Sequence, residues 1–596
     1  MDHVEKTAAV AALKARIDVA AKRRDADLVI RNCRIVNVFT DEVIAGDIAV
    51  VDGFVAAIGG HGSYRGTREV DAEGRFAAPG LIDAHMHLES VMVRPSQFAV
   101  TAVAHGTLGV IADPHEIANV CGVAGIEFIL EDTADIPLDV WVMVPSCVPA
   151  TGFETSGASL GADEIRPLID HPRVRGLGEM MNYPGVIAAD EAILEKLITP
   201  RAEIGQVADG HSPWVHGTDL AAYAAAGIRT DHECATVDEM LGRARLGMYV
   251  QIREGSACRN LDALVPGVTL ANSHRMLFCT DDKHPDDIAR NGHIDNNIRR
   301  AVKAGLDAVV AVRMASLNVA QCYGLRGVGA IAPGYRADVL LLDSLEDFSV
   351  RQVYRAGELV AEDGKALFAA NSFRDERVYC GLALQPLGPG SLRIPLTGDE
   401  ALCMGMRPHS VETDKLVEKV AVADGAFVND PARDILKLAV IERHHASGAV
   451  GLGLVKGFGL RGGAIASTVA HDSHNLIVIG DNDADMLAAA AELERVGGGI
   501  TIVSDGQPCD TLPLPIAGLM SDLSVEEVEQ RVSAMLARAY ALGVNPDVEP
   551  FMTLAFMALP VIPALKLTDQ GLFDVEAFSF TDIDVLQGAA AAPSGR

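Results

Sequence analysis

The alternation of short apolar runs with helical stretches between about residues 81 and 307 constrains the fold of this chain more than any other feature. Intervals such as 190–197 and 235–246 are typical of helices, and eight apolar runs predict strands. The predicted strands are 80–84, 106–112, 139–144, 174–180, 204–207, 227–230, 248–252 and 276–280. Eight such strands alternating with helices predict an α/β fold, a (β/α)8 barrel. A doubly wound sheet is the alternative, but no Gly-rich phosphate motif follows the first strand.

Two β-rich sections flank this region. Residues 28–80 contain short alternating runs, with Asp52-Gly53 placed as the turn of a hairpin. Residues 331–370 return to the same pattern after the barrel. We therefore expect the two flanks to pair and to form one small β-sandwich.

The rest of the chain divides into the barrel region and three further parts. Residues 1–27 predict a helical segment, the barrel spans 81–330, and 371–395 is an irregular linker. Residues 396–596 begin a separate α+β domain, in which 463–470 and 475–480 predict strands. Helices are predicted at 481–496 and at 434–447, where a glycine follows as a stop signal.

Composition narrows the classes of function. The net charge of −31 argues against a nucleic-acid-binding protein, which needs clustered Lys and Arg. Ten cysteines are scattered without a C-x-x-C pair, as expected in a reducing compartment. The sequence predicts neither a signal peptide nor a membrane-spanning run, so we expect a cytoplasmic location.

Two histidines, His85 and His87, end the first predicted strand. The period of two along a strand sends both imidazoles to one face, where they suit a transition metal. Taken alone, such a pair is more often just the polar end of a strand. The other strand ends therefore decide between the two interpretations.

Metal-binding residue types recur where the other predicted strands end. Enzymes with this barrel place their chemistry at the carboxyl ends of the strands. Strands one, four, five, six and eight each end in an imidazole or a carboxylate, and the residues are His85, His87, Glu179, His211, His232 and Asp281. Scattered core residues would not fall in phase with the strand ends, so the pattern predicts a metal site.

The order His-x-His, Glu, His, His, Asp resembles the amidohydrolase superfamily, whose β-sandwich is likewise assembled from both flanks of its barrel. Within it, several segments are similar to the bacterial adenine deaminase family. These are Pro79-Gly-Leu-Ile-Asp-Ala-His-Met-His-Leu-Glu-Ser90, Ala112-Asp-Pro-His-Glu-Ile117, Gly176-Leu-Gly-Glu-Met180, Thr230-Asp-His-Glu233, Thr280-Asp-Asp282 and, near the C-terminus, Gly463-Ala-Ile-Ala-Ser-Thr-Val-Ala-His-Asp-Ser-His-Asn475. The resemblance covers nearly the whole chain.

The resemblance implies a site for two divalent metal ions. His85 and His87 would hold one ion, His211 and His232 the other, and Glu179 would bridge them in place of the carboxylated lysine of many relatives. Manganese or iron is favoured by the resemblance, and zinc also suits imidazole and carboxylate ligands. Bound ions lower the pKa of water, and Asp281 would accept its proton during attack at C6 of adenine. Hypoxanthine and ammonia would be the products.

Other polar residues near the predicted site have two interpretations. Glu89 would either act catalytically on the purine edge or cap a helix. Five residues are predicted to contact the substrate or to support the ligands: His115, Glu116, Asp282, His471 and His474. The last two would reach the site if the C-terminal domain forms a cap over it.

We consider three functions for this chain. The leading hypothesis is a metal-dependent adenine deaminase that binds a small purine and forms a homo-oligomer, a dimer or larger, as the resemblance implies. The alternative is an amidohydrolase acting on a cyclic amide or an N-acyl substrate, since the same metal site would serve both. A scaffold without catalysis would have lost ligands, and this set is intact.

Overall fold

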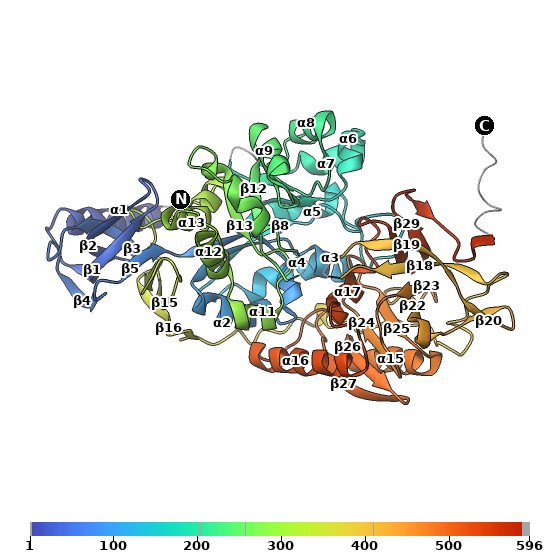
Figure 1. The fold of residues 1–596 in the computed structure, drawn as a ribbon. Helices are drawn as coiled ribbons and strands as arrows, with labels where there is room; N and C mark the ends of the chain where they lie inside the picture. Colours follow the sequence, from blue (N-terminus) through green and yellow to red (C-terminus); the bar gives the residue numbers. More distant parts are fainter. Residues whose placement is uncertain (1–2, 202–203, 257, 409, 587–596) are drawn as a thin grey trace.

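The computed structural model describes residues 3–201, 204–256, 258–408 and 410–586 (Figure 1). Helix α1 (His3–Ala20) covers part of the first sheet through Val19, as expected for a helical N-terminal segment. Among the described helices, none is long and apolar enough to cross a membrane.

The first sheet is built from both flanks of the central region. Nine strands form it, in the order β17-β16-β15-β14-β5-β1-β2-β3, with β4 paired to β1. Their bounds are β1 Ala26–Asn37, β2 Glu42–Val51, β3 Phe54–Gly59, β4 Gly66–Asp71, β5 Phe76–Pro79, β14 Val339–Leu342, β15 Val350–Arg355, β16 Glu358–Glu362 and β17 Lys365–Ala366. Strands β5 and β14 are antiparallel neighbours, and they join the two flanks in one sheet.

The predicted hairpin at Asp52-Gly53 is also present. It connects β2 to β3, and Val51 faces Phe54 across the turn. Both turn residues have positive φ, 51° for Asp52 and 75° for Gly53. That backbone matches the twist of the two strands and favours the Asp-Gly sequence.

Eight parallel strands occupy the middle of the molecule in two sheets. Five strands run in the order β10-β9-β8-β7-β6 and three in the order β11-β12-β13. Their bounds are β6 Leu81–Met86, β7 Thr107–Ala112, β8 Asp139–Val144, β9 Val174–Met180, β10 Val207–Gly210, β11 Thr230–Asp231, β12 Tyr249–Arg253 and β13 Met276–Cys279. Parallel bridges join the sheets at both seams, Ala208 to Ile228 and Met86 to Asp281. The strands therefore curl as the alternating sequence pattern requires.

Two of these strands begin later than predicted. The run at 204–207 extends as β10 only from Val207, and the run at 227–230 becomes the short β11. Gly205 and Gly227 have φ values of 84° and 94°, which are incompatible with a strand. The apolar pattern alone does not reveal this backbone constraint.

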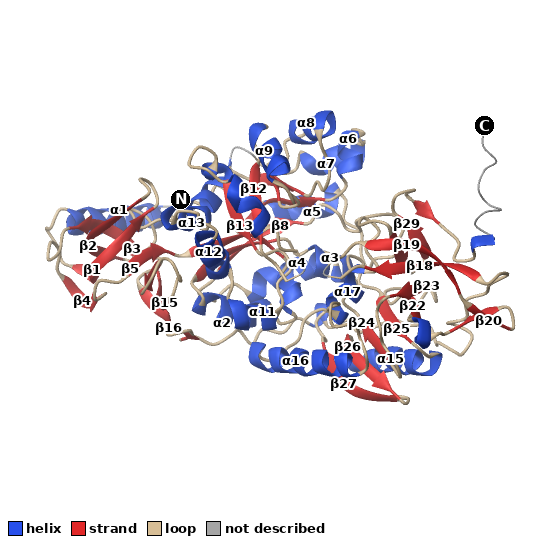
Figure 2. Ribbon diagram, viewed as in Figure 1, coloured by secondary structure: helices blue, strands red, loops and turns tan. Residues whose placement is uncertain are grey.

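Helices follow the parallel strands and cover them (Figure 2). Their bounds are α2 Pro95–Ala104, α3 His115–Cys121, α4 Val123–Asp132, α5 Ala162–Ile169, α6 Tyr183–Ile187, α7 Glu191–Leu197, α8 Gly217–Ala225, α9 Val237–Arg245, α10 Leu261–Leu264, α11 Pro285–Asn291, α12 Ile294–Lys303, α13 Ala308–Met314 and α14 Leu317–Cys322. The predicted helices at 190–197 and 235–246 correspond to α7 and α9. Their N-caps are Asp190 and Thr236, whose side chains accept backbone N–H groups.

The C-terminal region is dominated by an eight-stranded sheet in the order β19-β18-β23-β22-β25-β24-β26-β27. These strands are β18 Glu400–Met406, β19 Thr413–Lys419, β22 Ile435–Ile441, β23 Val450–Lys456, β24 Ala464–Ser467, β25 Leu476–Gly480, β26 Gly499–Ser504 and β27 Gln507–Pro513. Smaller elements are β20 Ala421–Ala423, β21 Ala426–Val428, β28 Leu565–Thr568, β29 Gly571–Asp574 and β30 Ser579–Phe580. The helices are α15 Asp483–Val496, α16 Val525–Ala541 and α17 Pro550–Phe556.

The predicted helix at 434–447 is wrong, because its apolar residues form strand β22. Every residue of β22 is buried, and its two sides face different cores. Leu436, Leu438 and Val440 pack into one core, while Ala439 and Ile441 pack into another. A strand covered on both faces has an uninterrupted apolar run, which sequence periodicity does not separate from a buried helix.

One hydrophobic core connects the central strands to the C-terminal region. Val110 and Val142 of the parallel strands belong to the same cluster as Leu436 and Ile477 of the C-terminal sheet. In Figure 1 the N-terminal sheet and the C-terminal sheet lie at opposite ends, with the parallel strands between them. The C-terminal region is therefore packed onto the central strands, where the functional residues lie.

Candidate active site

The six side chains predicted as metal ligands lie together at the carboxyl ends of the parallel strands. His85 belongs to β6 and His87 follows that strand directly, while Glu179 is the second-last residue of β9. The other three come just after β10, β11 and β13, and they are His211, His232 and Asp281. Five of the six are buried and His211 is half-buried. The strand period thus brings them to one place, as the pattern predicts.

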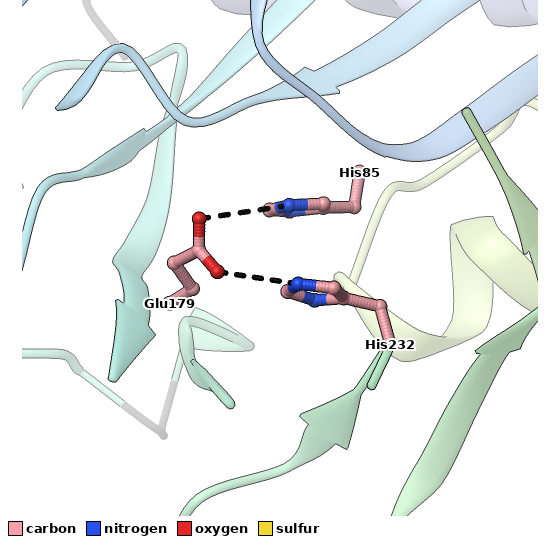
Figure 3. A group of neighbouring side chains, drawn as sticks. All are labelled: His85, Glu179 and His232. Atoms are coloured by element: carbon pink, nitrogen blue, oxygen red, sulfur yellow. Dashed lines mark ion pairs between the residues drawn. The ribbon is translucent and has the colours of Figure 1, made fainter. Parts of the chain in front are cut away.

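The carboxylate of Glu179 lies at the centre of four imidazoles. Its Oε1 is 3.3 Å from His87 Nε2 and 3.9 Å from His85 Nε2. Its Oε2 is 2.8 Å from His211 Nδ1 and 3.2 Å from His232 Nε2. Figure 3 shows His85 and His232 at the two oxygens. Each oxygen faces its own histidine pair, and this arrangement suits a carboxylate shared by two metal ions.

Burial alone would raise the pKa of Glu179, but the neighbouring imidazoles of His232, His211 and His87 hold it well below its usual range. The group is therefore a carboxylate, with lone pairs available on both oxygens. An ionised group at this depth needs positive charge around it.

The tautomer of His87 is fixed by Asp113. His87 Nδ1 lies 3.0 Å from the backbone carbonyl oxygen of Asp113. Because a carbonyl only accepts hydrogen bonds, Nδ1 carries a proton and donates it to Asp113, which leaves Nε2 as the nitrogen that could bind a metal. Nε2 lies 3.0 Å from Asp281 Oδ1. The Asp113 carboxylate also accepts the N–H of Glu179 at 2.8 Å. Asp113 therefore orients two predicted ligands, although it is missing from the predicted set.

His85 gives the most direct evidence for a metal. Its ring is fully buried, and neither of its nitrogens has a hydrogen-bond partner among the described residues. Burial and the nearby His232 ring lower the pKa of His85, so the imidazole is neutral. A buried ring nitrogen without a partner is costly, and a bound cation would satisfy it. The residues present thus fit the metal site expected from the sequence.

Asp281 is held by Arg253, whose Nη1 donates to Asp281 Oδ2 at 2.7 Å. Arg253 also pairs with Glu233, which lies beside His211 and His232. Burial would raise the pKa of Asp281, but Arg253 and the imidazoles of the site hold it well below its usual range. Arg253 and Glu233 are missing from the predicted set, although Glu233 directly follows His232 in the sequence.

Asp281 also has an unusual backbone, with a φ of 59°. A non-glycine residue in the left-handed region carries a cost of about 1–3 kcal/mol, which the surrounding structure must offset. Its N–H donates to the carbonyl of His85 at 3.0 Å, which closes the seam between the two parallel sheets. The seam therefore fixes Asp281 next to His85.

Glu89 takes the position of a helix cap. Its Oε1 accepts the N–H of Ile117, in the first turn of α3, at 3.0 Å. It is buried in the short 3₁₀ helix after His87 and does not belong to the residues that line the cavity above the site. Burial and the nearby Glu116 raise the pKa of Glu89 to about 7. This geometry favours the capping interpretation over a direct catalytic one.

Glu116 is bound by two histidines from the C-terminal region. His471 Nδ1 lies 2.8 Å from Glu116 Oε1, and His474 Nε2 contacts Oε2. Because His474 Nδ1 accepts the N–H of Ala470, the neutral ring carries its proton on Nε2, the nitrogen that lies against Glu116. Burial lowers the pKa of His474 to about 4, which keeps that ring neutral. His474 therefore supports Glu116 from the C-terminal region, as its predicted place beside the site implies.

His115 and Asp282 complete the predicted set. His115 Nδ1 is 3.4 Å from Glu179 Oε1, and its Nε2 is 3.4 Å from Glu116 Oε1. His115 therefore connects the central carboxylate to the pair formed by Glu116 and His471. Asp282 lines the cavity and accepts the hydroxyl of Ser90.

A cavity of about 170 Å³ opens above these residues. The barrel supplies its polar floor, including His87, Glu116, Glu179 and Asp281. The C-terminal region supplies an apolar roof, which we define as Val411, Phe556, Leu559, Val561 and Ile562. The sequence predicts a cap through His471 and His474, but not these apolar residues, because they lie in segments with no signal that relates them to the barrel.

The fold and the site define a metal-dependent amidohydrolase. Residues 76–360 match the Amidohydrolase family, and residues 410–579 match the Adenine deaminase C-terminal domain. The first match spans all the predicted metal ligands, and the second contains His471, His474 and the whole roof.

Curated relatives extend along nearly the whole chain. The chain is 53% identical to the adenine deaminase of Nitratidesulfovibrio vulgaris strain Hildenborough over 577 residues, 96% of this chain and 98% of that one. It is 50% identical to the adenine deaminase of Clostridium acetobutylicum, covering 95% and 99% of the two chains. For the adenine deaminase of Halalkalibacterium halodurans the identity is 48%, with 96% and 98% covered. The chain therefore belongs to the adenine deaminase family.

Proposed function

We propose that this protein hydrolyses adenine to hypoxanthine and ammonia at a site for two divalent metal ions. The observation that carries the proposal is Glu179, whose two oxygens each face a separate histidine pair beneath a closed roof. The relatives named above are adenine deaminases over their full length, which supports adenine as the substrate.

Two groups of ligands divide the site. His85 and His87 would hold one ion and His211 and His232 the other, with Glu179 between them. Imidazole and carboxylate ligands without thiolate suit manganese or iron, and also zinc. When bound, the ions lower the pKa of water and so supply a nucleophile near neutrality.

Asp281 is placed to move the proton. Its pKa is low, so it is ionised before the substrate arrives and can accept a proton from the attacking water. Arg253 holds one of its oxygens, while Oδ1 points to His87. The same carboxyl group can then return the proton to the departing amino group, which leaves as ammonia.

Purine binding is assigned to the two faces of the cavity. The apolar roof suits the flat ring and excludes bulk water from the reaction. Glu116, His115 and Asp282 offer polar groups on the floor towards the ring nitrogens. His471 contacts Glu116 and stacks on Phe556, with 4.4 Å between ring centroids, so it connects floor to roof.

The proposed function also implies how the barrel, the β-sandwich and the C-terminal domain are arranged. The two parallel sheets, joined at both seams, would form the (β/α)8 barrel over 81–330. The nine-stranded sheet from 28–80 and 331–370 would form the β-sandwich around its own apolar core. Residues 371–395 link these parts to a C-terminal domain from 396. The ten free cysteines fit a cytoplasmic location, and a homo-oligomer is expected from the family resemblance.

The test is ammonia release from adenine by protein loaded with Mn(II) or Fe(II). We expect turnover of adenine with two metal ions per chain. If adenine is untouched while a cyclic amide or an N-acyl substrate is hydrolysed, the alternative amidohydrolase activity is correct. Zn(II)-loaded protein in parallel identifies which metal supports the higher turnover.

A further inference from the structure

Two cysteines lie side by side beneath the active site, although 259 positions separate them in the sequence. Cys121 is the last residue of α3, and Cys380 lies in the segment that connects the central region to the C-terminal sheet. Their sulfur atoms are 3.8 Å apart. A disulfide has a sulfur–sulfur distance of about 2.05 Å, so oxidation would draw these two sulfurs closer together.

A buried guanidinium acts on this pair. Arg443 follows strand β22 and is almost fully buried. Its Nε donates to the carbonyl of His474 and its Nη2 to the carbonyl of Ala517, 2.9 Å away. Among the described residues, Nη1 has no hydrogen-bond partner and no carboxylate pairs with the guanidinium. A buried positive charge held only by carbonyl groups favours a nearby anion.

The two cysteines differ in solvent exposure and in the pKa of their thiols, as a reactive pair requires. Cys380 is exposed and Cys121 is half-buried. The contact with Cys121 and the charge of Arg443 lower the pKa of Cys380 to about 6. The same contact and burial raise the pKa of Cys121, which stays protonated. One accessible thiolate therefore lies beside a protected thiol.

We propose that Cys121 and Cys380 form a dithiol site that hydrogen peroxide oxidises to a disulfide. The Cys380 thiolate attacks one peroxide oxygen, the O–O bond breaks, and the leaving hydroxide takes up a proton as water. Cys380 is then a sulfenic acid. The Cys121 sulfur attacks the Cys380 sulfur, the S–O bond breaks, and the Cys121 proton leaves with the hydroxide as a second water. Two thiols are oxidised and one peroxide is reduced to two waters.

This site is attached to both elements that place Glu116. Helix α3 carries Glu116 in its first turn and Cys121 at its end. On the other side, Arg443 donates to the carbonyl of His474, whose ring lies against Glu116. A disulfide would therefore fix α3 to the connecting segment next to the cavity. The oxidation by peroxide involves only the chain's own thiols, and it does not depend on the proposed deaminase activity.

The test uses the full-length, metal-loaded protein treated with a small excess of hydrogen peroxide. We expect an intact mass lower by about 2 Da, the loss of two titratable thiols, and a linked peptide pair containing Cys121 and Cys380. Dithiothreitol should restore both thiols. The matched control is Cys509→Ser, which removes an exposed cysteine in the C-terminal sheet and should leave the linked peptide unchanged.

Two variants separate the steps. In Cys121→Ser, Cys380 should accumulate as a sulfenic acid that dimedone traps. In Cys380→Ser, Cys121 should remain reduced because it is half-buried and has lost its partner. The proposal is overturned if peroxide oxidises Cys509 while Cys121 and Cys380 stay reduced, or if either one pairs with a different cysteine.

Discussion

The floor and the roof of the cavity are built on different principles. The floor consists of imidazoles and carboxylates, most of them at strand ends, where strand geometry fixes their positions. The roof consists of apolar side chains from loops and from α17 in the C-terminal region. Chemistry at the floor needs defined atoms at defined distances, whereas the roof needs only apolar volume in the right shape. Each of the following changes acts on one face and leaves the other in place.

The largest expected effect comes from the centre of the floor. Glu179→Gln keeps the shape of the side chain but removes the charge that both histidine pairs face. We expect the bound metal to fall below two ions per chain and kcat/KM for adenine to drop by about 10³-fold or more, since bound metal supplies several kcal/mol. Metal analysis and ammonia release measure both. Glu254→Gln, at a buried glutamate paired with Arg300, is the control and should retain metal and activity. An unchanged metal content in Glu179→Gln would remove this residue from the bridging position.

Asp281→Asn tests proton transfer on the same face. An amide cannot accept the proton from water, so kcat should fall by about 10²–10⁴-fold, the usual contribution of a general base. Because the pKa of Asp281 is held low, the wild-type carboxylate is ionised throughout the range near neutrality. The activity of the wild-type protein should therefore not fall as pH decreases from 8 to 6 through protonation of this group. A wild-type rate loss in that range that disappears in the variant would contradict the assignment.

The roof should affect binding more than chemistry. Phe556→Ala removes a buried ring above the floor, and we expect KM for adenine to rise by about 10-fold to 100-fold, corresponding to about 1.5–3 kcal/mol of lost burial. Metal content should not change. Phe551→Ala, at a buried phenylalanine of the same helix that does not line this cavity, controls for general loss of packing. A fall in kcat with unchanged KM would mean that the roof takes part in the chemical step.

The smallest expected effect comes from Lys566, which supports the roof. Lys566 is buried and donates to the carbonyls of Val411 at 2.7 Å and Phe556 at 2.9 Å. Burial lowers the pKa of Lys566 to about 7. Between pH 7 and about 10 the unfolded chain therefore binds more protons than the folded one, and stability rises with pH by up to about 1.4 kcal/mol per unit from this residue.

Lys566→Met should remove this part of the pH dependence. Thermal unfolding from pH 7 to 10 measures it, with Lys415→Met as the control at a more exposed lysine paired with Asp574. Parallel stability curves for Lys566→Met and the wild-type protein would show that Lys566 is charged throughout. The roof would then be held by a buried ammonium group.

Sequence analysis predicts the floor much better than the roof, for a physical reason. His85, Glu179 and Asp281 follow apolar runs at fixed positions, and in a curled parallel sheet all such positions meet at one edge. The roof residues come from segments after residue 410, brought over the floor by packing between distant parts of the chain. No local period encodes that contact.

The incorrect assignments have a similar origin. Residues 435–441 were expected in a helix because a strand buried on both faces has no alternation. Asp113 supports the ligands through its backbone carbonyl as well as its side chain, and the backbone bond leaves no trace in residue type. Glu89 could be placed near His87 from the sequence, but its bond to Ile117 depends on where α3 begins.

The C-terminal region, which shares a hydrophobic core with the parallel strands, is synthesised after them. All six predicted metal ligands lie at or before residue 281, whereas the roof residues lie between 411 and 562. Because chains are made from the N-terminus, the floor emerges from the ribosome well before its cover. The ligands of the proposed metal site are therefore synthesised before any of the residues that cover them.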